Sequence, residues 1–134
     1  MLKKARIISN SICYGPQPEL EDEVEQRLSI TAEGRGVLVR YNYAGKRIEY
    51  KQLRIPKEEA QAVLRLIEMG ISQEGYMEVT DVGCWGLAAE TSNGEVIKIG
   101  GSLVPIQKDL TAASEKMREA TRLPLLMFDG GVDE

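Results

Sequence analysis

Three consecutive segments with alternating side chains, between residues 24 and 55, constrain the fold of this chain most strongly. The first alternates around Leu28 and Ile30, the second places apolar and aromatic side chains from Val37 to Tyr43 on one face, and the third runs from Arg47 to Ile55. Such alternation is typical of half-buried β-strands. The segments are joined by short turns that contain glycine, at 32–36 and 44–46. They therefore predict an antiparallel β-meander.

A helix is predicted directly after the meander. Pro56 suits the first position of a helix, and apolar side chains recur with helical spacing from Ala60 to Ile67. We expect this helix to cover residues 57–69 and to end at Gly70, because glycine commonly terminates helices.

The second half of the chain repeats the change from strand to helix. Residues 76–80 are expected to be extended, and a β-hairpin is predicted from the alternation that begins at Trp85, through the turn at 92–94, to a strand at 96–99. A second helix is expected from about residue 109–111 to Arg122, before Pro124. The last apolar segment, 125–128, either adds a terminal strand or lies as an extended cover over the core.

This order of elements predicts an α+β fold. We expect an antiparallel sheet built from a β-meander, helix, β-hairpin, helix and terminal strand, with two helices packed on the sheet. The length of 134 residues fits a single domain. Residues 1–20 are expected to contribute at most a loosely attached strand around 7–14, and the acidic tail 129–134 is expected to fray.

The sequence contains no histidine, and this narrows the possible chemistry. It removes the commonest general base, the usual catalytic zinc sites and the Ser-His and Cys-His nucleophile pairs. We therefore expect no enzyme activity, no metal and no cofactor. Cys13 and Cys84 lie 71 positions apart and are expected to be unpaired thiols, with Cys84 buried beside Trp85. A cytoplasmic location is expected, because no apolar run resembles an export signal or a membrane span.

Three features call for a choice between a functional and a structural interpretation. Asp81 could act with Glu78 and Tyr76 in a carboxylate-based enzyme, but an aspartate before glycine more often caps its own turn. The glycines at 100–101 lie too far from the next helix for a phosphate loop, so they indicate a bend or close packing. Trp85 is expected in the core, with its indole N–H bonded at the edge.

One block resembles a known sequence pattern. The segment DVGCWGLAAETSNGEVIKIGGSL at 81–103, with YKQLRIPKEEAQAVLRLIE before it and LPLLMFDG after it, is similar to a pattern found in small uncharacterised bacterial α+β domains. The resemblance covers about two-thirds of the chain. It implies the same fold class and, because those domains have no assigned activity, no catalytic residue.

The charge distribution is the strongest functional signal. Residues 35–57 carry seven basic side chains against Glu49 alone, a net charge of +6, whereas 1–34 carry −2 and 58–134 carry −8. The second and third strands of the meander thus form a basic hairpin on an acidic chain. The predicted partner-binding residues are Arg40, Tyr41, Tyr43, Arg47, Lys51 and Arg54.

We interpret the chain as a non-enzymatic interaction module, an inhibitor or adaptor of bacterial or mobile-element origin. Its basic hairpin would bind an acidic protein partner or a second copy of the chain, and the acidic stretch 19–25 would meet a basic surface. The alternative is nucleic-acid or nucleotide binding by the same hairpin, through phosphate contacts and base stacking. The chain's acidic pI of about 5.0 argues against that alternative. The protein's own carboxylates could also neutralise the hairpin, which would leave no binding surface.

Overall fold

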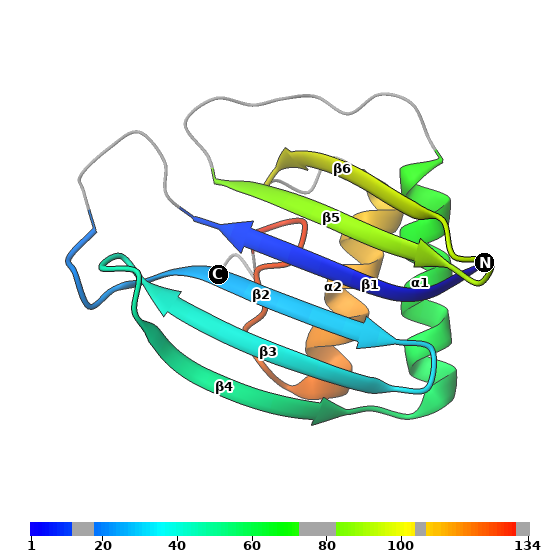
Figure 1. Ribbon diagram of the computed structural model, residues 1–134, viewed down its shortest axis with the longest axis horizontal. Helices are drawn as coiled ribbons and strands as arrows, with labels where there is room; N and C mark the ends of the chain where they lie inside the picture. Colours follow the sequence, from blue (N-terminus) through cyan, green and yellow to red (C-terminus); the bar gives the residue numbers. More distant parts are fainter. Residues whose placement is uncertain (12–17, 73–82, 104–106, 131–134) are drawn as a thin grey trace.

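The computed structural model describes residues 1–11, 18–72, 83–103 and 107–130. These residues form a six-stranded antiparallel sheet and two helices (Figure 1). In chain order the elements are β1 (Leu2–Asn10), β2 (Glu23–Thr31), β3 (Arg35–Asn42), β4 (Arg47–Arg54), α1 (Lys57–Ile71), β5 (Cys84–Thr91), β6 (Val96–Ser102) and α2 (Lys108–Thr121). The predicted α+β fold and the order of strands and helices are confirmed.

The strand order in the sheet is β4-β3-β2-β1-β5-β6. The meander β1 to β4 therefore forms one side of the sheet, and the β5–β6 hairpin extends the other side by pairing with β1. The first strand was expected to be loosely attached around 7–14, and this was wrong. β1 spans Leu2–Asn10 and lies in the middle of the sheet, where it pairs with β2 through Ile7 and Leu28 and with β5 through Ile7 and Leu87.

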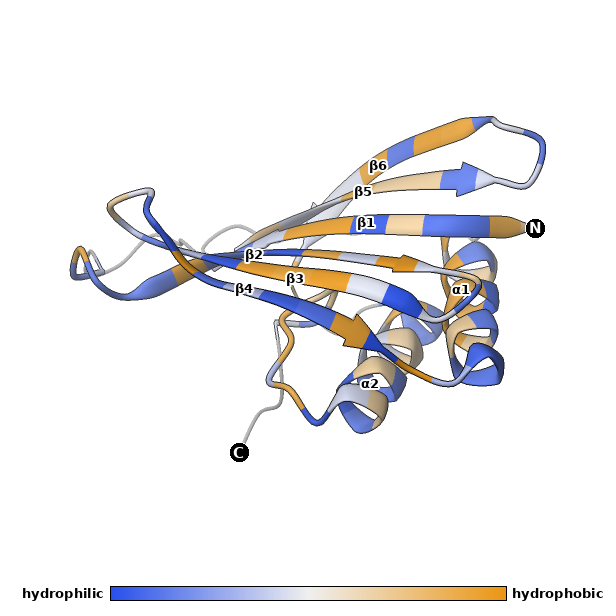
Figure 2. Cartoon of the chain, turned by 60° about the horizontal axis from the view of Figure 1, so that its bottom comes forward, coloured by the Kyte–Doolittle hydropathy of each residue, from blue (hydrophilic) through white to orange (hydrophobic). Residues whose placement is uncertain are grey.

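Both helices pack on one face of the sheet (Figure 2). Alternate residues of β1, β2, β3 and β5 point into the layer between sheet and helices, among them Ile7, Ile30, Leu38 and Leu87. The apolar stripe of α1, including Val63 and Ile67, closes this core. Burying each of these aliphatic side chains contributes about 1.5–3 kcal/mol.

Gly70 was expected to end the first helix, and this was wrong. α1 continues to Ile71, and Gly70 packs against the start of α2: a Cβ at this position would lie 2.8 Å from the side chains of Leu110 and Gln107. The glycine is therefore required by helix–helix packing, a contact that local sequence does not reveal.

The last apolar segment forms no strand of the sheet; of the two expected arrangements it takes the cover over the core. Leu125, Met127 and Phe128 are buried against the inner face, and the Phe128 ring contacts Trp85 edge to face at 4.8 Å between centroids. Gln26 Nε2 donates to the Pro124 carbonyl at 3.2 Å, and its Oε1 accepts from the Leu126 N–H at 2.8 Å. A side chain in the middle of the sheet thus fixes the backbone of the C-terminal segment.

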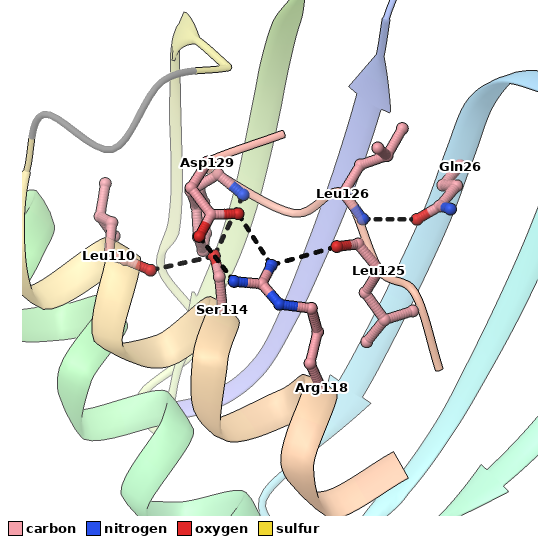
Figure 3. A network of polar contacts seen from close by, with 8 residues as sticks. Gln26, Leu110, Ser114, Arg118, Leu125, Leu126 and Asp129 are labelled. Carbon is pink, nitrogen blue, oxygen red and sulfur yellow. Dashed lines mark hydrogen bonds and ion pairs between the residues drawn. The ribbon is translucent and has the colours of Figure 1, made fainter. Parts of the chain in front are cut away.

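Asp129 holds the end of this segment and does not fray, contrary to the expectation for residues 129–134 (Figure 3). Its two carboxylate oxygens accept from Arg118 Nη1 and Nη2 at 2.8 and 2.7 Å. Arg118 Nη1 also donates to the Leu125 carbonyl at 3.1 Å. The remaining residues of the predicted tail, 131–134, lie outside the described residues.

Candidate binding surface

The sheet has one face that no described element covers (Figure 2). We call it the open face. Directly opposed residues of antiparallel strands share a face, so the register defines its composition. Four rows of side chains run across it from β4 to β6: Arg54-Arg35-Thr31-Lys4-Glu90-Val96, Gln52-Val37-Ser29-Arg6-Ala88-Lys98, Tyr50-Val39-Arg27-Ile8-Gly86-Gly100 and Arg47-Tyr41-Glu25-Asn10-Cys84-Ser102.

Basic side chains predominate in these rows. The rows contain seven cationic side chains and two carboxylates, which gives the open face a net charge of +5, although the whole chain carries −4. Both carboxylates already have partners: Glu25 accepts from Arg27 Nε at 2.8 Å, and Glu90 lies 3.2 Å from Lys3 Nζ. The hydrogen bond to Glu25 raises the pKa of Arg27 above its ordinary value, against a smaller opposing effect of desolvation. Among the described residues, six cations of the open face have no carboxylate within 4.0 Å: Lys4, Arg6, Arg35, Arg47, Arg54 and Lys98.

The structure divides the six predicted partner-binding residues between the two faces. Tyr41, Arg47 and Arg54 lie on the open face. Arg40 and Lys51 lie on the helix-covered face. Arg40 is two residues after the buried Leu38 on β3, and Lys51 on β4 is the register partner of Leu38. Tyr43 follows the end of β3, half-buried, and its backbone N–H donates to the Asp22 carbonyl at 2.9 Å. The six residues therefore do not form one site.

Arg40 is neutralised by the protein itself. Its Nε lies 3.4 Å from Glu23 Oε2 and 3.1 Å from Glu49 Oε1, and only 18% of its side chain is exposed. The Nε and Glu23 Oε2 are both buried and form no aligned hydrogen bond, so the contact is electrostatic. The expectation that Arg40 projects outward to a partner was therefore wrong. Alternation along β3 places its side chain on the helix-covered face, beside the acidic start of β2.

Both tyrosines of the open face are already stacked by arginine. The Arg27 guanidinium lies 4.6 Å from the centre of the Tyr41 ring, and that of Arg47 lies 5.7 Å from the centre of the Tyr50 ring. Cation–π contacts of this kind are favourable and hold the side chains in place. One side of each ring is therefore covered by a cation of the protein's own.

Apolar side chains lie among these cations. Val37 and Val39 on β3 are half-buried, while Tyr50 and Ile8 are 53% and 38% exposed. Tyr50, Val39 and Ile8 lie in one row. The open face thus has aliphatic side chains interspersed among basic and aromatic groups, and arginine and tyrosine are enriched in protein–protein interfaces.

The sequence reasoning missed the basic residues outside the hairpin. Lys4 and Arg6 enter the open face because β1 is the central strand, and Lys98 enters because β6 follows β5 at the far edge. Each sits at a polar position of an alternating strand, so the signal was present in the sequence. Only the strand order brings them onto the same surface as Arg35 and Arg54.

Tyr76, Glu78 and Asp81, the residues proposed for carboxylate chemistry, lie outside the described residues. Within the described part of the chain, no group of three or more histidine, cysteine, aspartate or glutamate side chains is arranged to hold a metal ion. Three polar side chains hold the C-terminal segment by hydrogen bonds. Ser9 Oγ donates to the Met127 carbonyl, and Ser114 Oγ accepts from the Phe128 N–H. Arg118 donates to Asp129 (Figure 3).

The residues around Trp85 behave as predicted, with one exception. Trp85 is 5% exposed and its indole N–H donates to the Ser102 carbonyl at 3.1 Å, which confirms a core tryptophan bonded at the edge. A Cβ at Gly101 would lie 2.7 Å from the indole ring, which confirms close packing as the role of this glycine. Cys84 was expected to be buried, and this was wrong: it precedes Trp85 on an alternating strand and so lies exposed on the open face.

Comparisons with known proteins add no further assignment. Neither a scan against family models, nor a search of curated proteins, nor a search of solved structures finds a match to this chain. Within the described residues, both helices are too short or too polar to cross a lipid bilayer.

Proposed function

We propose that this protein is a non-enzymatic binding module whose open sheet face binds an acidic surface of another protein. The observation that carries the proposal is the charge of that face, seven cations against two carboxylates that already have partners. Arginine and tyrosine next to exposed aliphatic side chains favour a protein partner, because these residues supply most of the binding energy in protein interfaces. The role would be that of an inhibitor or adaptor.

Nucleic acid is the less favoured ligand of the same face. Single-strand binding proteins stack bases on exposed aromatic rings. Here an arginine already occupies one side of the Tyr41 ring and one side of the Tyr50 ring, so at most one side of each ring is left for a base. At low ionic strength, the net charge of −4 also repels an approaching polyanion over distances up to the Debye length.

Self-association through the open face is also less favoured. A two-fold dimer places the same patch on both subunits. Two open faces, each with a charge of +5, would then oppose each other. A head-to-tail contact between the open face and the acidic remainder of a second copy is complementary in charge but would generate a closed ring or an open filament. A different, acidic protein needs no such assembly, and it is the partner that we propose.

Affinity capture with matched charge-reversal variants tests the proposal. The wild-type chain, the open-face variant Arg35→Glu, Arg47→Glu, Arg54→Glu and a control with Lys57→Glu and Arg65→Glu on α1 are immobilised and exposed to a nuclease-treated cell lysate. We expect a protein that the wild type and the control retain and that the open-face variant loses. Its complex with the purified chain should then be reproduced by calorimetry, with at least a tenfold loss of affinity for the open-face variant.

Two results would contradict the proposal. Capture that is unchanged by the three open-face reversals would show that the basic rows take no part in binding. Retention that disappears on nuclease treatment, and is restored by a purified oligonucleotide, would assign the face to nucleic acid instead.

A further inference from the structure

One pair of arginines on the open face is placed differently from the other cations. Arg35, the first residue of β3, is the direct register partner of Arg54, the last residue of β4. Side chains in this relation start about 5 Å apart, and like charges directly opposite each other are destabilising. Both arginines are exposed, and among the described residues no carboxylate lies within 4.0 Å of either.

The protein also provides a depression at this pair. It has a volume of about 640 Å³ and is lined by Arg35, Gly36, Val37, Gln52, Leu53 and Arg54. Val37 and Gln52 form the adjacent register pair on the same face, so two arginines, one amide and one aliphatic side chain surround the space. The depression is partly open to solvent, so a ligand bound there would keep part of its surface exposed.

The backbone on both sides of the pair is fixed. Gly34 has a φ of +94°, which favours glycine, and a Cβ there would collide with the Ile55 carbonyl. A Cβ at Gly36 would lie 2.6 Å from the Ser29 carbonyl oxygen. The Ile55 N–H donates to the Gly34 carbonyl at 2.9 Å, which ties the residue after Arg54 to the residue before Arg35. The backbone positions of the two arginines are therefore fixed opposite each other before any ligand binds.

We infer that the Arg35–Arg54 depression is a binding site for a phosphomonoester group. Arginine presents a planar fork of donors that matches phosphate oxygens, and a phosphomonoester carries a charge of about −1.5 to −2 at pH 7. Such a dianion neutralises both guanidinium groups, whereas a single carboxylate would neutralise only one of the two. The nearest further charges in this row are Lys4 on β1 and Glu90 on β5, beyond the uncharged Thr31 on β2.

The site goes beyond the proposed function, because a phosphate can arrive on a small molecule or on a phosphorylated side chain. The shared chemistry is the dianionic phosphomonoester, and the probes distinguish its source. Inorganic phosphate represents the free ion, phenyl phosphate a small organic ester, and a blocked phosphoserine peptide the modified side chain. The same peptide with glutamate in place of phosphoserine controls for charge alone.

Titrations followed by NMR of the ¹⁵N-labelled full chain test the inference. We expect the backbone amide of Gly36 and the Nε–H groups of Arg35 and Arg54 to shift with the phosphate probes at pH 7.5. Arg35→Gln and Arg54→Gln should each weaken binding at least about tenfold, since each removes charge-assisted hydrogen bonds to the phosphate oxygens. Arg65→Gln on α1 is the matched control. The tightest of the three phosphate probes identifies the source.

Two further readouts separate a ligand site from a structural role. Without ligand, Arg54→Gln should raise the Tm at low salt, because it removes a repulsion; an arginine retained for stability would lower it. Phosphate binding should weaken from pH 7.5 to 5.5, because the ester takes up its second proton with a pKa of about 6 while arginine stays charged.

The inference is overturned if none of the phosphate probes shifts these signals, or if the glutamate peptide binds as tightly as the phosphoserine peptide. It is equally overturned if Arg35→Gln and Arg54→Gln bind like wild type. None of these results bears on the capture experiment, whose readout is a protein partner, so the two proposals can fail separately.

Discussion

Arg118 and Asp129 form an ion pair whose side chains are only 10% and 5% exposed. Removing one member of a buried pair costs about 3–5 kcal/mol, because the other charge remains buried without a partner. Asp129→Asn should therefore lower the free energy of unfolding by about 3 kcal/mol, which urea denaturation measures. The exposed Glu119→Gln on the same helix as Arg118 should change it by less than about 0.5 kcal/mol. Equal effects of the two substitutions would assign the pair no structural role.

Gly101 and Gly86 offer a matched pair of glycines on neighbouring strands. A Cβ at Gly101 would lie 2.7 Å from the Trp85 ring, whereas a Cβ at Gly86 would meet nothing within 4 Å. Gly101→Ala should destabilise the fold by about 1–3 kcal/mol through overpacking and should shift the emission of Trp85, the sole tryptophan. Gly86→Ala should be neutral or stabilising by up to about 1 kcal/mol. A neutral Gly101→Ala with unchanged fluorescence would contradict the described packing.

At the scale of single residues, the sequence predicts environments well and contacts poorly. The burial of Trp85 follows from alternation along its strand. The neutralisation of Arg40 has two causes. Alternation along β3 places Arg40 on the helix-covered face, and its partner Glu23 comes from a different strand. The face of Arg40 could have been predicted by continuing the alternation from Leu38, whereas that of Arg47 depends on the β-bulge between β3 and β4. The ion pairs of Arg40 could not be predicted, because they depend on the register between strands.

Among the elements, the C-terminal segment has the largest effect on the core for its length. Leu125, Met127 and Phe128 fill the space between the sheet and α2, and the hydrogen bonds of Gln26 and Ser9 lock their backbone. Deleting residues 123–134 should expose the inner face, abolish cooperative unfolding and produce binding of the dye ANS. Deleting only 131–134 is the control and should leave the transition unchanged. Cooperative unfolding of the longer deletion would show that the segment is dispensable.

The elements themselves were largely predictable, because alternation and helical spacing are local properties. The meander, both helices and the β5–β6 hairpin were expected near their observed positions. The position of β1 was not, because its pairing with β5 joins segments separated by residues 11–83. The segment that ends at Phe128 could not be assigned between strand and cover, because a short apolar run suits both and only its partners decide.

On the scale of the whole molecule, the charges are separated between one face and the rest. The open face carries +5 while the chain carries −4, so the remainder carries −9. At pH 7 and about 0.01 M salt, where screening extends about 30 Å, the protein should bind a cation exchanger despite its net negative charge. Arg35→Glu, Arg47→Glu, Arg54→Glu should abolish this retention, whereas Lys57→Glu with Arg65→Glu should largely preserve it. Elution of the wild type in the void volume would contradict the charge separation.

The candidate surface could be predicted only in part from the sequence. The net charge of +6 in residues 35–57 predicted binding by the β3–β4 hairpin, and Tyr41, Arg47 and Arg54 do lie on the open face. A count along the chain cannot separate the two faces of a strand, so it included Arg40 and Lys51. It also cannot place Lys4, Arg6 and Lys98 beside the hairpin, because strand order is a property of the complete sheet.

The central position of β1 has a consequence for how the chain reaches its native state. β1 to β4 can form as successive hairpins between strands that are neighbours in the sequence. β5 instead pairs with the free edge of β1 after α1 has crossed the sheet. Closing that long loop costs conformational entropy before the pairing of β5 with β1 contributes any stabilisation. We therefore expect the docking of β5–β6 onto β1 to limit the folding rate. The species most prone to aggregation should be the four-stranded sheet in which the second edge of β1 is still unpaired.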